Sequence, residues 1–118
     1  MVTIEQLAQA ALAGDSLLLR SLTQDFLRGK PSLRECPPPK TEDARLLAAA
    51  ASLIELFAMR LQQTPPPWTK DVAPLSEPMF LLKAAATMKR LRALCETESP
   101  EPLRRRGFYA PPNFLEFA

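Results

Sequence analysis

Apolar side chains recur at three- and four-residue spacings over residues 41–63, the longest stretch of helical pattern in the chain. On a helix they form one continuous apolar stripe. Alanines and further large apolar residues on the opposite side leave only Ser52 and Glu55 to face water in the middle turns. Thr41 can cap the first amides, and Pro65–Pro67 forbid continuation. The pattern predicts a central helix over about residues 41–63 that packs on more than one side. Its stripe is Leu46, Leu47, Ala50, Leu53, Ile54, Phe57 and Leu61.

Two shorter amphipathic stretches precede the central helix, over about residues 3–28. Thr3 and Gln6 have the spacing of a capping box, in which each side chain bonds the other's backbone amide. Gly14 can end the first helix, and Asp15 or Ser16 can cap a second helix that runs through Arg28. The pattern predicts a helical hairpin. The apolar face expected for the second helix is Leu18, Leu19, Leu22, Phe26 and Leu27.

Two helices joined by a turn with one glycine also invite a DNA-binding helix-turn-helix interpretation. The register argues against it. With Gly14 as the turn glycine, the next position should be apolar but is Asp15. Two expected core positions of the second helix would then be Arg20 and Thr23. We therefore favour a plain helical hairpin.

Proline-rich stretches separate the helical ones. Residues 29–40, GKPSLRECPPPK, favour an extended connection, which we name the first strap; a proline-rich ligand for an aromatic groove is the less favoured alternative. Residues 64–75 form the second strap, and Trp68 follows its three prolines. Such a tryptophan can plug a gap in a helical core, which we favour, or be presented rigidly to a partner. Ser76 and Pro78 then mark the start of a fourth helix to about residue 96.

Composition fits this organisation. The chain has 118 residues, 47% of them hydrophobic, which is enough for one core in a single domain over residues 1–118. We expect an all-α, single-domain bundle of about four main helices with proline-rich connections. Cys36 and Cys95, without any histidine, do not make an ordinary zinc site, so no metal or cofactor is expected. Reduced thiols and the lack of a signal-peptide or membrane-span pattern favour a soluble, cytoplasmic protein. The net charge of +2 does not suggest a polyanion-binding protein.

Residues 99–118 contain a short turn and an aromatic C-terminal segment. Its aromatic residues either fold back over the helices as a lid or are an exposed anchor for another chain. Arginine and aromatic side chains are also the usual anchors of protein interfaces. The arginine and aromatic residues together give a candidate partner-binding site for another protein. A homo-oligomer is the other arrangement that the sequence allows. The site residues are Trp68, Arg104, Arg105, Arg106, Phe108, Tyr109 and Phe114.

The stretch from Lys83 to Arg106 is rich in basic residues and is followed at once by Phe108 and Tyr109. Basic residues beside aromatic ones can bind single-stranded nucleic acid, so a small nucleic-acid-binding regulator is the alternative function. The plainer interpretation is that Arg104–Arg106 are solvated or pair with Glu96, Glu98 and Glu101. We favour the plainer interpretation over nucleic-acid binding.

The second half of the chain resembles small bacterial proteins found as companions of toxin–antitoxin-type nucleotidyltransferases. The resemblance lies in PPPWTKDVAPLSEPMFLL and LRALCETESPEPLRRRGFYAPPNFL. It implies an antitoxin-like or accessory partner of such an enzyme, and it carries over no catalytic residue. The positions that match the pattern are Trp68, Leu91, Arg92, Ser99, Pro100, Arg104, Arg106 and Phe108.

An enzyme is the least favoured function. The pairs Glu42 with Asp43 and Glu96 with Glu98 are spaced so that they do not share one helical face. Without histidine the commonest general base is missing, and three glycines leave no phosphate-binding loop. Cys95 would need a neighbour that lowers its pKa, for which Arg92 is the local candidate. The sequence therefore predicts a non-enzymatic protein-interaction module.

Overall fold

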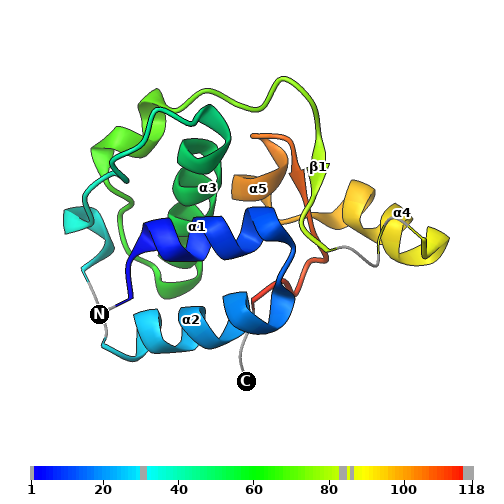
Figure 1. Ribbon diagram of the computed structural model, residues 1–118, viewed down its shortest axis with the longest axis horizontal. Coiled ribbons are helices and arrows are strands. Elements are labelled where there is room, and N and C mark those ends of the chain that lie inside the picture. The colour runs from blue at the N-terminus through cyan, green and yellow to red at the C-terminus, as the bar shows by residue number, and fades with distance from the viewer. Residues whose placement is uncertain (1, 30–31, 83–84, 86, 116–118) are drawn as a thin grey trace.

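The helix α3, Ala44–Leu61, runs through the middle of the protein, and the other elements pack around it (Figure 1). The computed structural model describes residues 2–29, 32–82, 85 and 87–115. Every residue of α3 from Ala48 to Ala58 is buried. A helix that is buried on all sides needs neighbours on all sides, as the apolar pattern predicted. Ser52 and Glu55, expected to face water, are buried with the rest, which corrects that expectation.

The ends of α3 differ slightly from the predicted ones. Asp43, not Thr41, is the cap: its carboxylate accepts hydrogen bonds from the amides of Arg45 at 2.9 Å and Leu46 at 3.4 Å. The Thr41 hydroxyl instead accepts from the amide of Asp43 at 3.0 Å. The predicted helix over residues 41–63 therefore begins three residues later. Gln62, in the left-handed conformation with φ 56°, ends it just before the prolines.

The N-terminal hairpin is confirmed. The helices α1, Ile4–Ala13, and α2, Ser16–Arg28, meet at Gly14, whose φ of 73° is a conformation that favours glycine. The capping box joins the Thr3 amide to Gln6 Oε1 at 2.9 Å and the Gln6 amide to Thr3 Oγ1 at 3.3 Å. Asp15 caps α2. One position of the apolar face differs, because Leu18 is exposed.

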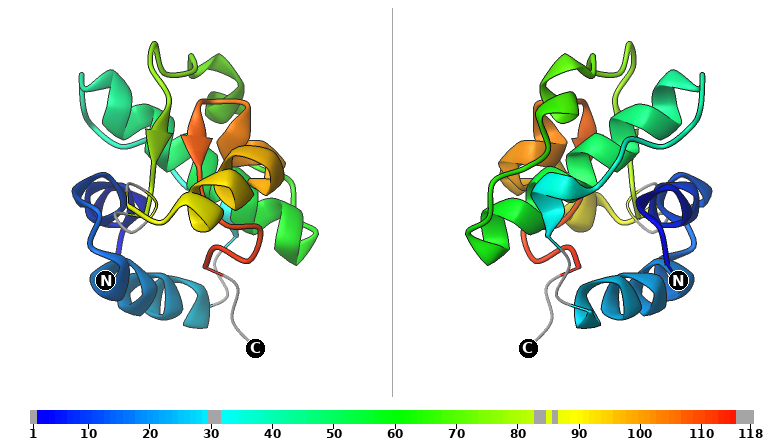
Figure 2. Two further views of the ribbon diagram at one scale, coloured as in Figure 1. Left: turned by 90° about the vertical axis from the view of Figure 1, so that its right-hand side faces the viewer. Right: turned by 90° about the vertical axis from the view of Figure 1, so that its left-hand side faces the viewer.

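The prediction of a fourth helix over about residues 78–96 is wrong for its first half. Residues Met79–Phe80 form strand β1, which pairs in parallel with β2, Phe108–Tyr109, and only then does α4, Lys89–Glu98, begin. The amide of Met79 donates to Gly107 O at 2.8 Å, and that of Leu81 to Tyr109 O at 2.9 Å. The all-α class is thus corrected to a mostly helical protein with a small two-stranded parallel sheet. Figure 2 shows the two strands side by side, with α4 on the near side in the left view.

Both straps contain a short 3₁₀-helix instead of being wholly extended. The first contains η1, Leu33–Glu35, and the second contains η2, Pro67–Asp71. The indole nitrogen of Trp68 donates to Cys36 O at 2.8 Å, so the tryptophan joins the two straps. A short helix α5, Glu101–Arg104, lies between α4 and β2.

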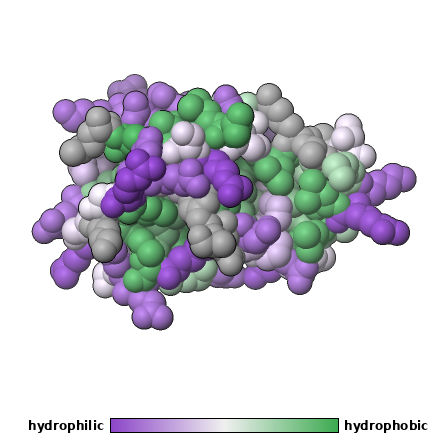
Figure 3. Space-filling model, turned by 90° about the horizontal axis from the view of Figure 1, so that it is seen from below, coloured by the Kyte–Doolittle hydropathy of each residue, from purple (hydrophilic) through white to green (hydrophobic). Residues whose placement is uncertain are grey.

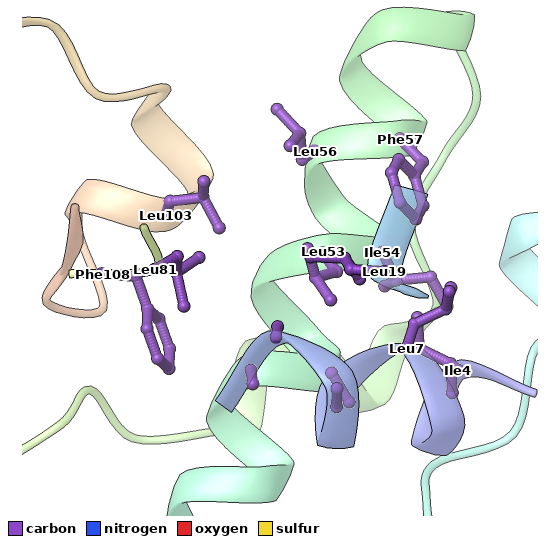
Figure 4. Packing of buried hydrophobic residues seen from close by; sticks show 14 of the residues in the cluster. Ile4, Leu7, Leu19, Leu53, Ile54, Leu56, Phe57, Leu81, Leu103 and Phe108 are labelled. Atoms are coloured by element: carbon purple, nitrogen blue, oxygen red, sulfur yellow. The ribbon is translucent and has the colours of Figure 1, made fainter. Parts of the chain in front are cut away.

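The hydrophobic core lies on both sides of α3. Figure 4 shows Ile4, Leu7 and Leu19 on one side of the helix, and Leu81, Leu103 and Phe108 on the other. The first group comes from α1 and α2, and the second from the C-terminal half. One core therefore joins the two halves of the chain through α3.

We expect Leu53→Ala to lower the free energy of unfolding by about 2–5 kcal/mol, because Leu53 is completely buried in the middle of α3 and its loss leaves a cavity. Leu61→Ala is the matched control, because Leu61 lies at the end of the same helix with 47% of its surface exposed. Urea denaturation measures both. Equal stability of Leu53→Ala and the parent protein would contradict the central place of α3.

Candidate functional site

Glu55 lies at the centre of a polar cluster that is otherwise surrounded by the core. It projects from α3, is 8% exposed, and forms ion pairs with Arg106 through Oε1 and with Arg105 through Oε2. Arg106 also donates a hydrogen bond to the main-chain oxygen of Thr69 in η2. The carboxylate therefore joins the central helix, the second strap and the turn before β2.

The two arginines of this cluster have different surroundings. Arg106 is buried, with 6% of its surface exposed, whereas 49% of the Arg105 side chain is exposed. One carboxylate balances one positive charge, so the three ionised groups together keep a net charge of +1. Because Arg106 is enclosed, the surplus charge is presented to water by Arg105.

Arg104 lies beside them on α5 and has a separate partner. It forms an ion pair with Glu101 at 2.8 Å, and both side chains are well exposed. Of the pairings predicted for Arg104–Arg106, only this one is found. The sequence analysis does not predict the pairing of Arg105 and Arg106 with Glu55. A signal for it exists, because a single glutamate inside an apolar helix needs a basic partner when it is buried.

Two of the predicted aromatic anchors belong to the core. Phe108 is completely buried and Phe114 is 6% exposed, so neither is available as an exposed anchor in this structure. Tyr109 is half-buried and packs against Phe80, with ring centroids 5.4 Å apart. As far as Leu115, the segment folds back over the helices as a lid, the first of the two alternatives. Phe117 lies outside the described residues.

The structure brings only part of the predicted site together. The bond from Arg106 to Thr69 places η2, which carries Trp68, beside the turn that contains Arg105. Trp68 itself is half-buried against the core, as expected for a core plug. We name the exposed guanidinium groups of Arg104 and Arg105 the arginine surface. It is the part of the predicted site that remains accessible.

The basic stretch of residues 83–106 is divided between two places. Lys89, Arg90 and Arg92 lie on α4, which projects at the right-hand end of Figure 1, whereas Arg104 and Arg105 lie on or next to α5. Arg92 pairs with Glu96 at 3.1 Å and covers the Phe80 ring, 5.1 Å from its centroid. Lys83 lies outside the described residues.

The two cysteines have the environment of structural thiols. Both are free, and burial raises the pKa of each thiol; Glu96 raises the pKa of Cys95 further. A raised pKa keeps a thiol protonated at neutral pH, whereas a cysteine nucleophile needs its pKa lowered. The predicted activator, Arg92, is paired with Glu96. Within the described ranges no three histidine, cysteine or acidic side chains gather as metal ligands would.

An open cleft of about 590 Å³ lies between the start of α3 and residues 71–79. Leu47, Val72 and Met79 provide apolar walls, while Arg45 and Asp71 bring charges of opposite sign. Arg45 donates a hydrogen bond to the Met79 sulfur at 3.4 Å. The cleft therefore has neither a single sign of charge nor a convergent set of polar groups that would select one ligand class.

Comparison with known proteins adds no relative: the chain matches no family model, no curated protein and no solved structure. Among the helices in the described part of the chain, none has the length and apolar character needed to cross a bilayer.

Proposed function

We propose that the protein is a non-enzymatic interaction module that binds an acidic protein surface through the arginine surface. The observation that carries the proposal is the geometry of Arg105. Its guanidinium is held by buried Glu55, whose charge Arg106 already balances, while half of the Arg105 side chain remains exposed. A positive charge is thus fixed at the surface by a carboxylate that Arg105 shares with Arg106.

Fixing this charge favours association for an entropic reason. A free arginine loses side-chain freedom when it binds, whereas Arg105 is already held by its bond to α3. A guanidinium can then offer its remaining N–H groups to a carboxylate of the partner. Arg104 is the neighbouring exposed cation, and its weak surface pair with Glu101 can exchange for a partner's carboxylate at little cost.

The sequence resemblance supplies a partner class for this proposal. It suggests a bacterial nucleotidyltransferase of the toxin–antitoxin type, with this protein as its antitoxin-like or accessory partner in the cytoplasm. The acidic patch is then expected on the enzyme.

The test is co-expression with each nucleotidyltransferase of the host, followed by titration of any complex. Arg105→Ala is expected to weaken the complex by roughly 10- to 100-fold, the effect of removing one partner of a close interfacial charge pair. Arg28→Ala is the matched control, because Arg28 is exposed and forms an exposed ion pair with Asp25 at 3.3 Å on α2. Equal losses from both variants, or none from Arg105→Ala, would contradict the assignment of this surface.

A small nucleic-acid-binding regulator is the second candidate. Arg92 over Phe80, and Phe80 against Tyr109, form a stack of the kind on which bases also stack. Lys89 and Arg90 precede Arg92 in the first turn of α4. A mobility shift with random duplex and single strands at low salt decides between the candidates, because phosphate contacts weaken steeply as salt is added. No shift at low salt would remove this candidate.

A further inference from the structure

The helix α4 packs on the rest of the protein through very few side chains. Of its ten residues only Cys95 is buried and Leu91 is half-buried, and the others are exposed. Figure 3 shows strongly hydrophilic side chains projecting from this right-hand end of the protein. A helix this short is not stable in water without tertiary packing. The helix α1 has the same length but buries half of its residues, namely Ile4, Leu7, Ala8, Ala10 and Ala11.

The sequence of α4 also gives the helix little stability of its own. Lys89 and Arg90 are in the first turn, and Glu96 and Glu98 are in the last. This order is unfavourable, since cations are stabilising at a helix C-terminus and anions at its N-terminus. The N-cap residue makes no side-chain capping hydrogen bond that would compensate. The ion pair of Arg92 with Glu96 is exposed, and an arginine four residues before a glutamate is the weaker of the two orders.

Two buried residues attach the chain to the core on either side of α4. Ala85, before the helix, is 1% exposed, and Ser99, after it, is 5% exposed. The Ser99 hydroxyl accepts a hydrogen bond from the Ala110 amide at 2.9 Å and donates to the Ala110 main-chain oxygen at 3.0 Å. These two bonds join Ser99 to a residue outside α4. They can therefore persist when the helix is lost.

We propose that α4 unfolds locally and reversibly, while Ala85, Ser99 and the core around α3 stay folded. A local opening needs less free energy than global unfolding, because only the few contacts of one element are lost. In the closed state the Arg92 guanidinium covers the Phe80 ring, 5.1 Å from its centroid, and the Cys95 thiol is buried. The opening removes the charged cover from the ring and brings the thiol into contact with water.

The opening gives the protein two states that differ at one end of the molecule. The arginine surface lies on α5 and the following turn, which come after Ser99 and keep their contacts with α3 in both states. The inference therefore goes beyond the proposed function and does not depend on it. Its functional content is a conformational switch, because an aromatic ring and a thiol that are covered in the closed state are accessible in the open one.

Alkylation of Cys95 measures the opening directly. Cys36→Ser leaves Cys95 as the only thiol and keeps the main-chain oxygen of residue 36 that accepts a hydrogen bond from Trp68. The labelling rate with excess iodoacetamide is measured at increasing urea below the unfolding transition. We expect the rate to change little with urea, because a local opening exposes little surface, and to exceed the rate allowed by global unfolding at least about tenfold. A rate that follows the global free energy of unfolding at every urea concentration would overturn the proposal.

Two variants in the Cys36→Ser background separate local from global opening. Leu53→Ala destabilises the core far from α4, so the Cys95 labelling rate should stay within about twofold of its value in the background. Labelling through global unfolding would instead rise roughly thirtyfold or more. Ala93→Gly lowers the helix stability of α4 at an exposed position, so it should accelerate labelling about four- to fivefold. A large rise in Leu53→Ala, or no rise in Ala93→Gly, would contradict a local opening of α4.

Amide hydrogen exchange on the parent protein tests the same proposal without any substitution. The amides of α4 should exchange at least about tenfold faster than those of α1, after correction for intrinsic rates, because α1 has the same length but opens only with the core. Circular dichroism and urea denaturation establish that each labelled variant is folded. Equal protection of α4 and α1 would show that α4 opens only when the whole protein unfolds, and it would overturn the proposal.

Discussion

Glu55→Gln is expected to lower the free energy of unfolding by about 3–5 kcal/mol, because it leaves the buried guanidinium of Arg106 without a countercharge. The amide keeps the size of the side chain and can accept one hydrogen bond, so the loss is electrostatic and not a packing defect. At roughly 4 °C per kcal/mol for a chain of this length, the melting temperature should fall by more than 10 °C. Thermal and urea denaturation measure the two quantities.

Glu101→Gln is the matched control, since it removes the carboxylate of the exposed pair with Arg104. Exposed pairs contribute about 0–1 kcal/mol, so this variant should be nearly as stable as the parent protein. Adding Arg106→Met to Glu55→Gln should recover part of the loss, because the uncompensated buried charge is then absent. If Glu55→Gln and Glu101→Gln are equally stable, the buried pair does not hold the C-terminal half on α3.

Phe108→Ala should destabilise the protein by about 3–5 kcal/mol. Phe108 is completely buried and lies with Leu81 and Leu103 on one side of α3 (Figure 4). Its position in β2 makes it part of both the sheet and the core. The measurement also decides the role of the aromatic segment: a lid residue stabilises the isolated chain, whereas an anchor for another protein does not.

The adjacent Tyr109 provides the control. It is half-buried and contacts Phe80 at the surface end of the sheet, so Tyr109→Ala should cost clearly less than Phe108→Ala in urea denaturation. A Phe108→Ala protein with an unchanged urea midpoint would show that the segment is not required for the core, and it would restore the anchor interpretation.

The elements predicted well from sequence are those whose signals are local. The capping box of Thr3 and Gln6, the left-handed Gly14 and the prolines after Gln63 act within a few residues of the ends they set. The small error at the start of α3 has the same origin. Thr41 and Asp43 are both good capping residues two positions apart, and the pattern does not rank them.

The errors concern contacts between residues that are distant in sequence. Residues 78–88 have helical apolar spacing, yet Met79 and Phe80 pair with Phe108 and Tyr109, and this pairing overrides local preference. Glu55 was placed in water because the arginines that bind it are 50 and 51 residues further along the chain. The sequence therefore identifies the candidate arginines, but it does not show which of them are exposed and which is buried.

The parallel pairing of β1 with β2 has a kinetic consequence. Its partners, such as Met79 and Phe108, are far apart in sequence, and a long loop must close before the first ladder bond forms. Among α1, α2 and α3, only the contacts of α1 with α2, which meet at Gly14, involve short separations, because α3 lies at least as far from α1 along the chain as β1 lies from β2. Short-range contacts form faster than long-range ones, so the hairpin of α1 and α2 is expected to form before the packing of α3 and the pairing of the sheet.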